Sequence, residues 1–91
     1  MPDFVVLMMG SQSEGDWDTY IEKLIGTGRF RGGSSLGNGV SMSKGKPDSD
    51  SAITGFMRFS AENIEEVRQL LAGNPSYEAG GRIEVLEEIP D

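Results

Sequence analysis

Near its start the chain carries six consecutive apolar residues, Phe4 to Met9, closed by Gly10. The run is too short for a typical helix and rich in strand-forming residues, so it predicts a β-strand. A strand with one face in water alternates apolar and polar residues, whereas this run is apolar at every position. We therefore expect a central strand that is buried on both of its faces.

An amphipathic helix is predicted over residues 16–25. Its apolar residues follow the i, i+3, i+4, i+7, i+8 pattern and are Trp17, Tyr20, Ile21, Leu24 and Ile25. Asp16 and Asp18 stand at the N-terminal end, where the helix dipole favours carboxylates. Gly26 or Gly28 would supply a left-handed stop.

The middle of the chain predicts weaker elements. Residues 29–36 indicate a strand softened by glycines, followed by a tight Gly-Asn-Gly turn at 37–39 and a short returning strand at 40–43. Residues 45–51 are the most polar stretch and indicate a mobile loop. A clear strand is expected over residues 53–59.

A second amphipathic helix follows, with an apolar stripe of Ile64, Val67, Leu70 and Leu71. Ser60 is its expected N-cap, and Gly73 with Pro75 would end it. Residues 74–81 are expected to be a loop, residues 81–86 the last strand, and residues 87–91 an acidic tail.

The resulting strand–helix–strand–strand–helix–strand order predicts one α+β domain over residues 1–91 with the ferredoxin-like βαββαβ plan and an antiparallel sheet. Both helices lie on one face of such a sheet, which leaves the other face uncovered. Because the first strand is apolar on both sides, we expect two copies to pack sheet against sheet as a dimeric α+β barrel. The alternative is a long loop that covers the second face.

Composition excludes several functions. The sequence contains no cysteine and no histidine, so thiolate chemistry, cysteine-bound metals and the commonest general base are excluded. It has 15 acidic and 8 basic residues and a net charge of −7, with no basic stripe for nucleic acid or an anionic membrane. We expect a cytoplasmic protein without metal or cofactor.

Three stretches of the C-terminal half form a recognisable pattern: Ser-Ala-Glu-Asn-Ile-Glu-Glu-Val at 60–67, Leu-Leu-Ala-Gly-Asn-Pro at 70–75 and Gly-Gly-Arg-Ile-Glu-Val at 80–85. Together with the opening strand, they resemble the YCII-related (DGPF-domain) family. The resemblance implies a dimeric α+β barrel, and in a few relatives a small-molecule enzyme with a His–Asp pair, including a dehalogenase-like member. This chain lacks the histidine, and Ser-Asp-Ser-Ala at 49–52 replaces the Asp-Gly-Pro-Phe motif.

Charged residues inside otherwise apolar strands are the main site candidates. Arg82 and Glu84 alternate with Ile83 and Val85, which are expected to pack on the helices. Enclosed charges need partners, so these residues indicate either an arginine that holds a carboxylate ligand or an Arg–Glu pair at an interface or strand edge. The candidate ligand-binding set is Arg31, Ser34, Ser35, Arg58, Tyr77, Arg82 and Glu84.

Other patterns favour structural roles. The glycines of residues 26–32 hint at a nucleotide-binding fingerprint, but they follow a helix instead of a strand. Glu14, Asp16 and Asp18 lack the spacing of a calcium loop, so capping explains them better. Trp17 and Tyr20 could wall a cleft, although core packing is the simpler interpretation.

Three functions remain open. The first is a dimeric small-molecule-binding domain without assigned catalysis, whose ligand is a small organic acid. The second is a lyase, isomerase or dehalogenase-like enzyme acting on an organic acid or lactone, with Arg58 or Arg82 holding the carboxylate and Glu84 or Tyr77 transferring a proton. The third is a protein-interaction module that presents an acidic helix face, including Glu65 and Glu66, and the acidic tail.

Overall fold

The computed structural model describes residues 1–10 and 15–90 of the 91-residue chain. Most of the predicted turn at residues 11–15, Glu14 and the last residue of the acidic tail therefore lie outside the described residues. The elements in chain order are β1 (Asp3–Met9), α1 (Trp17–Thr27), β2 (Phe30–Ser35), β3 (Val40–Ser41), β4 (Ser49–Asp50), β5 (Ile53–Ser60), α2 (Ile64–Leu71), α3 (Pro75–Glu78) and β6 (Arg82–Glu87).

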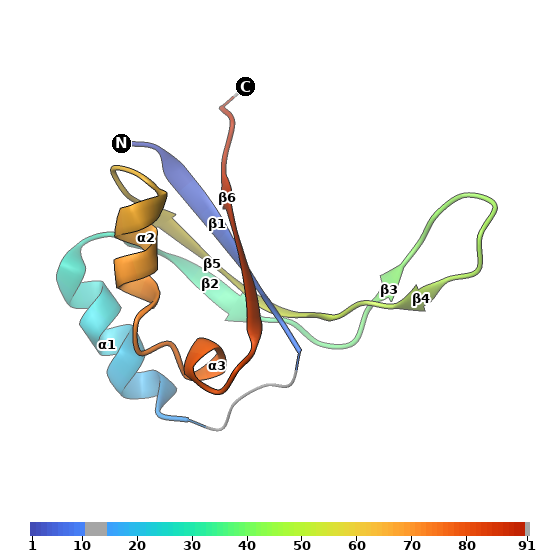
Figure 1. Cartoon of the computed structure of the whole chain (residues 1–91), viewed down its shortest axis with the longest axis horizontal. Helices are drawn as coiled ribbons and strands as arrows, with labels where there is room; N and C mark the ends of the chain where they lie inside the picture. Colours follow the sequence, from blue (N-terminus) through green and yellow to red (C-terminus); the bar gives the residue numbers. More distant parts are fainter. Residues whose placement is uncertain (11–14, 91) are drawn as a thin grey trace.

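Four strands form one antiparallel sheet in the order β2-β5-β1-β6, shown in Figure 1. The apolar run of the sequence is β1, which lies between β5 and β6 as a central strand should. With α1 joining β1 to β2 and α2 joining β5 to β6, this is the ferredoxin-like arrangement. The predicted fold class, an α+β domain with an antiparallel sheet, is confirmed.

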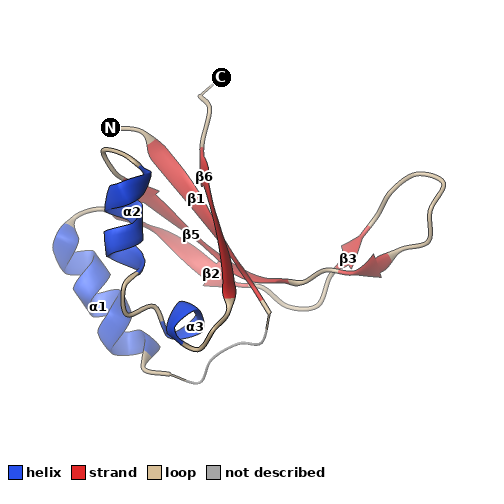
Figure 2. Ribbon diagram, in the orientation of Figure 1, coloured by secondary structure: helices blue, strands red, loops and turns tan. Residues whose placement is uncertain are grey.

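The core lies between the sheet and the helices, which all cover the same face (Figure 2). Alternate residues of β1, namely Phe4, Val6 and Met8, are buried there. They meet Leu24 of α1 and Val67 of α2, both fully buried, as the helical periodicity of these segments requires. Ile83 and Val85 of β6 also pack against this core, as expected.

Within the described residues, no helix lies over the other face of the sheet. We call it the open face and define it by the apolar residues Val5, Leu7, Phe56 and Leu86. The register places Val5 opposite Arg58 and Leu86, and Leu7 opposite Phe56 and Glu84. Val5 and Leu7 are only half-buried and Leu86 is exposed. A single chain thus covers one side of β1 and leaves the other apolar side accessible.

The predicted hairpin of residues 29–43 is wrong. Val40 does not return along β2 but pairs with Asp50, and Ser41 pairs with Ser49, so that β3 and β4 form a small separate sheet. The partner of β2 is β5. The Gly-Asn-Gly segment therefore leads away from the sheet instead of reversing the chain, and the turn falls at Lys44–Lys46, where the predicted loop begins.

Two helix boundaries also differ from prediction. Ser60 is the last residue of β5, and its hydroxyl donates to Asp3 at 2.6 Å, so Asn63 caps α2 instead. Pro75 does not simply end a helix: it opens the short helix α3 within the predicted loop, because proline is favoured in a first turn.

The ends of α1 are as predicted. The Asp16 carboxylate caps its N-terminus by accepting from the Thr19 backbone N–H at 3.0 Å and from the Thr19 hydroxyl at 2.6 Å. These hydrogen bonds lower the pKa of Asp16. Gly28 ends the helix with a φ of 71°, a left-handed conformation that favours glycine. Of the glycines in residues 26–32, Gly26 therefore lies inside α1, Gly28 ends the helix and Gly32 lies in β2.

Candidate functional site

A cleft of about 480 Å³ lies beside α1 at the β2 edge of the sheet, and its lining includes Ser34 and Phe56, which the register places on the open face. Residues of α1, of three sheet strands and of α3 line it: Met8, Trp17, Ile21, Phe30, Gly32, Gly33, Ser34, Ser35, Thr54, Phe56, Met57 and Ser76. Its walls are mostly apolar and aromatic. Such a concave, largely apolar space with a few polar groups is typical of small-molecule sites.

Trp17 performs both roles that the sequence left open. Its ring packs against the core and makes an edge-to-face contact with Tyr20, with 6.0 Å between ring centroids. Trp17 also lines the cleft. Across the cleft, Phe30 stacks in a tilted geometry on buried Phe59, with 5.7 Å between centroids. The two aromatic walls are therefore held by the core and do not depend on a ligand.

Apart from the indole N–H of Trp17, the polar side-chain groups among the residues that line the cleft are hydroxyls. Ser34 donates to the Ser35 carbonyl at 2.8 Å, and Thr54 donates to the Met8 carbonyl at 3.3 Å. Ser76, at 6% exposure, is the least exposed of the four hydroxyl residues. No charged side chain is among the described residues that line this cleft. Hydroxyls can donate to and accept from a neutral polar group, but they cannot neutralise a charge.

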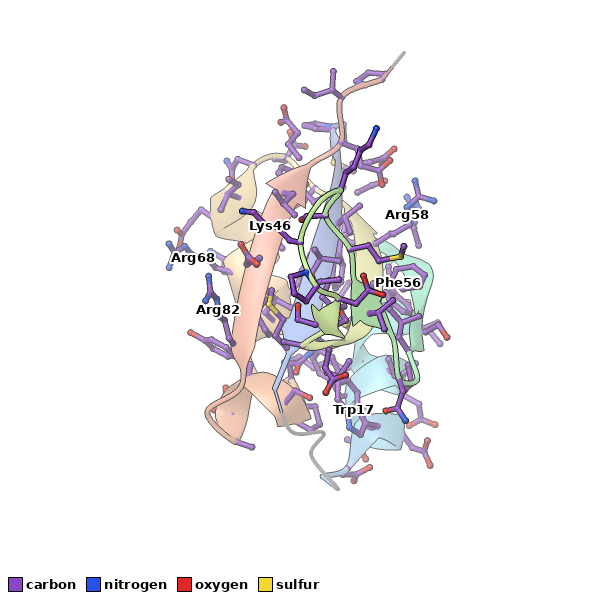
Figure 3. All side chains as sticks on the ribbon, turned by 90° about the vertical axis from the view of Figure 1, so that its right-hand side faces the viewer. Trp17, Lys46, Phe56, Arg58, Arg68 and Arg82 are labelled. Atoms are coloured by element: carbon purple, nitrogen blue, oxygen red, sulfur yellow. The ribbon has the colours of Figure 1, made fainter. Side chains whose placement is uncertain are left out.

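The seven candidate residues do not meet in one place. Ser34 and Ser35 line the cleft, whereas Arg31 and Arg58 line a separate hollow of about 310 Å³. Arg82 lines another hollow of about 410 Å³. Figure 3 shows Arg58 and Arg82 at opposite sides of the sheet.

The two remaining candidates lie apart from the cleft. Tyr77 is 52% exposed on α3. Glu84 is exposed, opposite Leu7 on the open face.

Arg58 and Arg31 already have partners. Arg58 forms a two-pronged ion pair with Glu88, and Arg31 donates to the Gly28 carbonyl at 2.9 Å. An Arg–Glu pair therefore exists at the sheet, as one interpretation of the sequence held, but it joins Arg58 to the tail instead of Arg82 to Glu84. Among the described residues, Arg82 and Glu84 take part in no ion pair.

Sequence reasoning missed the part of the site that lies behind the cleft. Asn74 is fully buried; its side-chain oxygen accepts from the Tyr77 backbone N–H at 3.1 Å. Its amide group lies 3.6 Å from the sulfur of Met57 and 3.9 Å from that of Met8. Asn74 followed by Pro75 is a signal for a helix start, and it could have placed Ser76 next to the core.

Tyr20 lies near Asn74, behind the cleft. Its hydroxyl donates to the Leu70 carbonyl at 2.9 Å, which ties α1 to α2. Burial raises the pKa of Tyr20 to about 12, so the phenol stays protonated at neutral pH. Tyr20 therefore serves as a structural hydrogen-bond donor and not as a base.

Within residues 1–10 and 15–90, no group of three or more Asp and Glu side chains could hold a metal ion. No helix within the same ranges has the length and hydropathy needed to cross a membrane.

Comparison with known proteins adds little to this site. No protein-family model matches the sequence, and no curated protein matches it at a significant level. One solved structure with a similar arrangement is 5-chloro-2-hydroxyhydroquinone dehydrochlorinase from Burkholderia phenoliruptrix AC1100, in complex with 2,5-dihydroxybenzoquinone. It has 17% sequence identity, a TM-score of 0.45 and coverage of 90% of each chain. A similarity this distant carries no information on activity.

Proposed function

We propose that this protein is a homodimeric small-molecule-binding domain of the YCII-related type, and that its ligand binds in the cleft beside α1. The observation that carries the proposal is the cleft itself, whose aromatic walls and hydroxyl groups are positioned by the core. The sequence patterns at 60–67, 70–75 and 80–85 and the ferredoxin-like topology support the family assignment.

The lining favours an uncharged ligand with a flat apolar body and one or two oxygen atoms. Trp17 and Phe30 offer ring surfaces, and Ser35, Thr54 and Ser76 offer hydroxyls. A carboxylate in this cleft would lose its water without gaining a cation, which is costly. Because Ser34 and Ser35 lie at the cleft, they are the two of the seven candidates that we retain for this ligand.

The sequence led us to expect a small organic acid as the ligand. Such a ligand would need a binding site other than the cleft. Arg82 favours this second candidate, because it lines its own hollow with Gly10 and Gly81 and pairs with no carboxylate among the described residues. An organic acid bound there would be held by one guanidinium group at the end of β6.

The homodimer is supported by the open face. Val5, Leu7, Phe56 and Leu86 form an apolar surface on the sheet that none of the helices in residues 1–10 and 15–90 covers. Packing two such faces together would bury the second side of β1. Catalysis by a His–Asp pair is excluded, because the sequence has no histidine.

A thermal-shift screen tests the ligand. The panel pairs neutral ring compounds with carboxylates of the same shape, for example phenol with benzoate and catechol with dihydroxybenzoate. We expect neutral compounds to raise the melting temperature of the wild type, and Ser35→Trp, which fills the mouth of the cleft, to abolish the shift. Arg82→Gln should leave it unchanged.

The outcomes separate the two sites. If only carboxylates stabilise the protein, and if this effect is lost in Arg82→Gln but kept in Ser35→Trp, the ligand site is the hollow at Arg82 and not the cleft. The absence of a shift with every compound at millimolar concentration would overturn small-molecule binding of these classes.

A further inference from the structure

A two-stranded arm projects from the body of the protein. We define the arm as residues 36–52, which contain β3 and β4 and the turn between them (Figure 1). The radius of gyration is 14.2 Å, whereas a compact chain of this length has about 12 Å. The molecule measures 45 Å along its longest axis and only 18 Å along its shortest. The arm is therefore a substantial extension and not a tight surface loop.

Few interactions within the chain stabilise the conformation of the arm. Its ladder consists of two residue pairs, Val40 with Asp50 and Ser41 with Ser49. Val40 is 58% exposed and Met42 is 73% exposed, and neither joins the hydrophobic core. Two-stranded hairpins are marginally stable in water unless their side chains pack on another surface. Exposed apolar side chains on such an arm indicate that it packs on something outside this chain.

The direction of the arm says where that surface lies. In Figure 3 the arm lies in front of the sheet, on the side of the open face. The helices lie behind the sheet. A second copy that packs on the open face must therefore meet the arm.

The arm carries charges of both signs in different places. Lys44 and Lys46 lie in its turn, whereas Asp48 and Asp50 follow on the returning side, so the arm as a whole has no net charge. Glu84 stands on the open face. Neither the two lysines nor Glu84 takes part in an ion pair among the described residues. The lysines of the turn could still attract Glu84 of a second copy locally, where the two groups come close.

We infer that the arm clasps a second copy of this chain: Val40 and Met42 pack on the partner's open face, and Lys44 and Lys46 lie near the partner's Glu84. This inference rests on the proposed homodimer and gives it a specific interface. The arm also begins at the rim of the cleft, because Leu36 donates its backbone N–H to the Thr54 carbonyl at 2.9 Å. Packing the arm on a partner would therefore fix one wall of the ligand site.

Sedimentation equilibrium of the full chain tests the clasp. We expect the wild type to have twice the 9.8 kDa mass of one chain. Val40→Ser with Met42→Ser should raise the dimer dissociation constant by about tenfold or more, because two apolar contacts are lost. Ile25→Ser is the matched control: Ile25 is 65% exposed on α1, on the helix side of the sheet, and its loss should leave the dissociation constant unchanged.

Charge reversal gives a second, independent readout. Lys44→Glu with Lys46→Glu should weaken the dimer, as should Glu84→Lys alone, and combining the three should recover part of the affinity. Circular dichroism at low concentration verifies that each variant is folded.

The two proposals fail in different ways. A wild-type chain that sediments as a 9.8 kDa monomer at all concentrations would overturn the homodimer and the clasp together. A wild-type dimer whose dissociation constant is unchanged by both the serine and the charge-reversal variants would overturn the clasp and leave the homodimer standing.

Discussion

Arg58 and Glu88 form an ion pair across the central strand of the sheet. The Arg58 Nε donates to Oε1 of Glu88 and Nη2 donates to Oε2, each at 2.8 Å. Arg58 is opposite Val5 of β1, and the backbone N–H of Glu88 donates to the carbonyl of Asp3 on the other side of this strand, so the pair spans β1. Glu88 in the C-terminal tail thus binds the guanidinium group of Arg58, which the sequence analysis had proposed as the partner of a carboxylate ligand.

The first prediction is that this pair contributes little to stability or to ligand binding. Its side chains are 50% and 32% exposed, so water screens the attraction, and such pairs contribute about 0.2–1 kcal/mol. We expect Arg58→Gln and Glu88→Gln each to lower the free energy of unfolding in urea within that range. Neither variant should alter the thermal shift caused by a neutral ring compound. Loss of that shift in Arg58→Gln but not in Glu88→Gln would place Arg58 in the ligand site after all.

The second prediction concerns alkaline pH. The pKa of Tyr20 is about 12 in the folded protein and 10.0 is its ordinary value, so folding favours the neutral phenol. Its contribution to stability is fully present below pH 10 and is lost as the pH rises from 10 to 12. Urea unfolding of the wild type should therefore show stability falling through this window.

Tyr20→Phe is the control for this titration. At pH 7 it should be less stable than the wild type by about 1 kcal/mol, because the hydrogen bond to the Leu70 carbonyl is lost. Between pH 10 and 12 the difference between the two proteins should shrink. Parallel stability curves across this range would show that Tyr20 does not cause the dependence.

The third prediction compares two glycines. A Cβ on Gly33 would overlap the Phe56 carbonyl oxygen and lie 2.9 Å from the Met57 Cα, so Gly33→Ala forces β2 away from β5. We expect a loss of 1–3 kcal/mol, roughly the cost of an overpacked site. Gly26→Ala adds a methyl group in α1 that meets nothing within 4 Å, and should stabilise the protein by about 0.5–1 kcal/mol. Equal effects in urea unfolding would contradict the close approach of β2 and β5.

The fold was predictable because its main elements have strong periodic signals. The stripes of α1 and α2 indicate which residues face the core, and Tyr20, Leu24, Val67 and Leu71 are buried as expected, whereas Ile25 and Ile64 at the stripe ends are exposed. The run of β1 is buried only at alternate residues, because a single chain covers one of its faces. The βαββαβ order then leaves few arrangements. The hairpin at residues 29–43 was mispredicted because turn residues mark where the chain bends and not which strand it pairs with afterwards.

The site was less predictable for a physical reason. Charged residues in strands stand out in a sequence, so Arg58, Arg82 and Glu84 became candidates, yet they lie on the open face or at the sheet edges. The cleft is instead built from residues that resemble ordinary core, such as Met8, and from hydroxyls such as Ser76. Only the three-dimensional packing of α1 and α3 on the sheet reveals that these side chains surround an empty space.

Fluorescence of Trp17 tests the central claim most directly, because it is the single tryptophan of the chain and it lines the cleft. The wild type is titrated with the neutral ring compound that gives the largest thermal shift. The control variant is Ser35→Phe, which fills the cleft as Ser35→Trp does but adds no second tryptophan. A ligand in the cleft should change the emission saturably in the wild type and not in Ser35→Phe. A compound that stabilises the protein but leaves the emission of Trp17 unchanged would bind elsewhere and contradict the account.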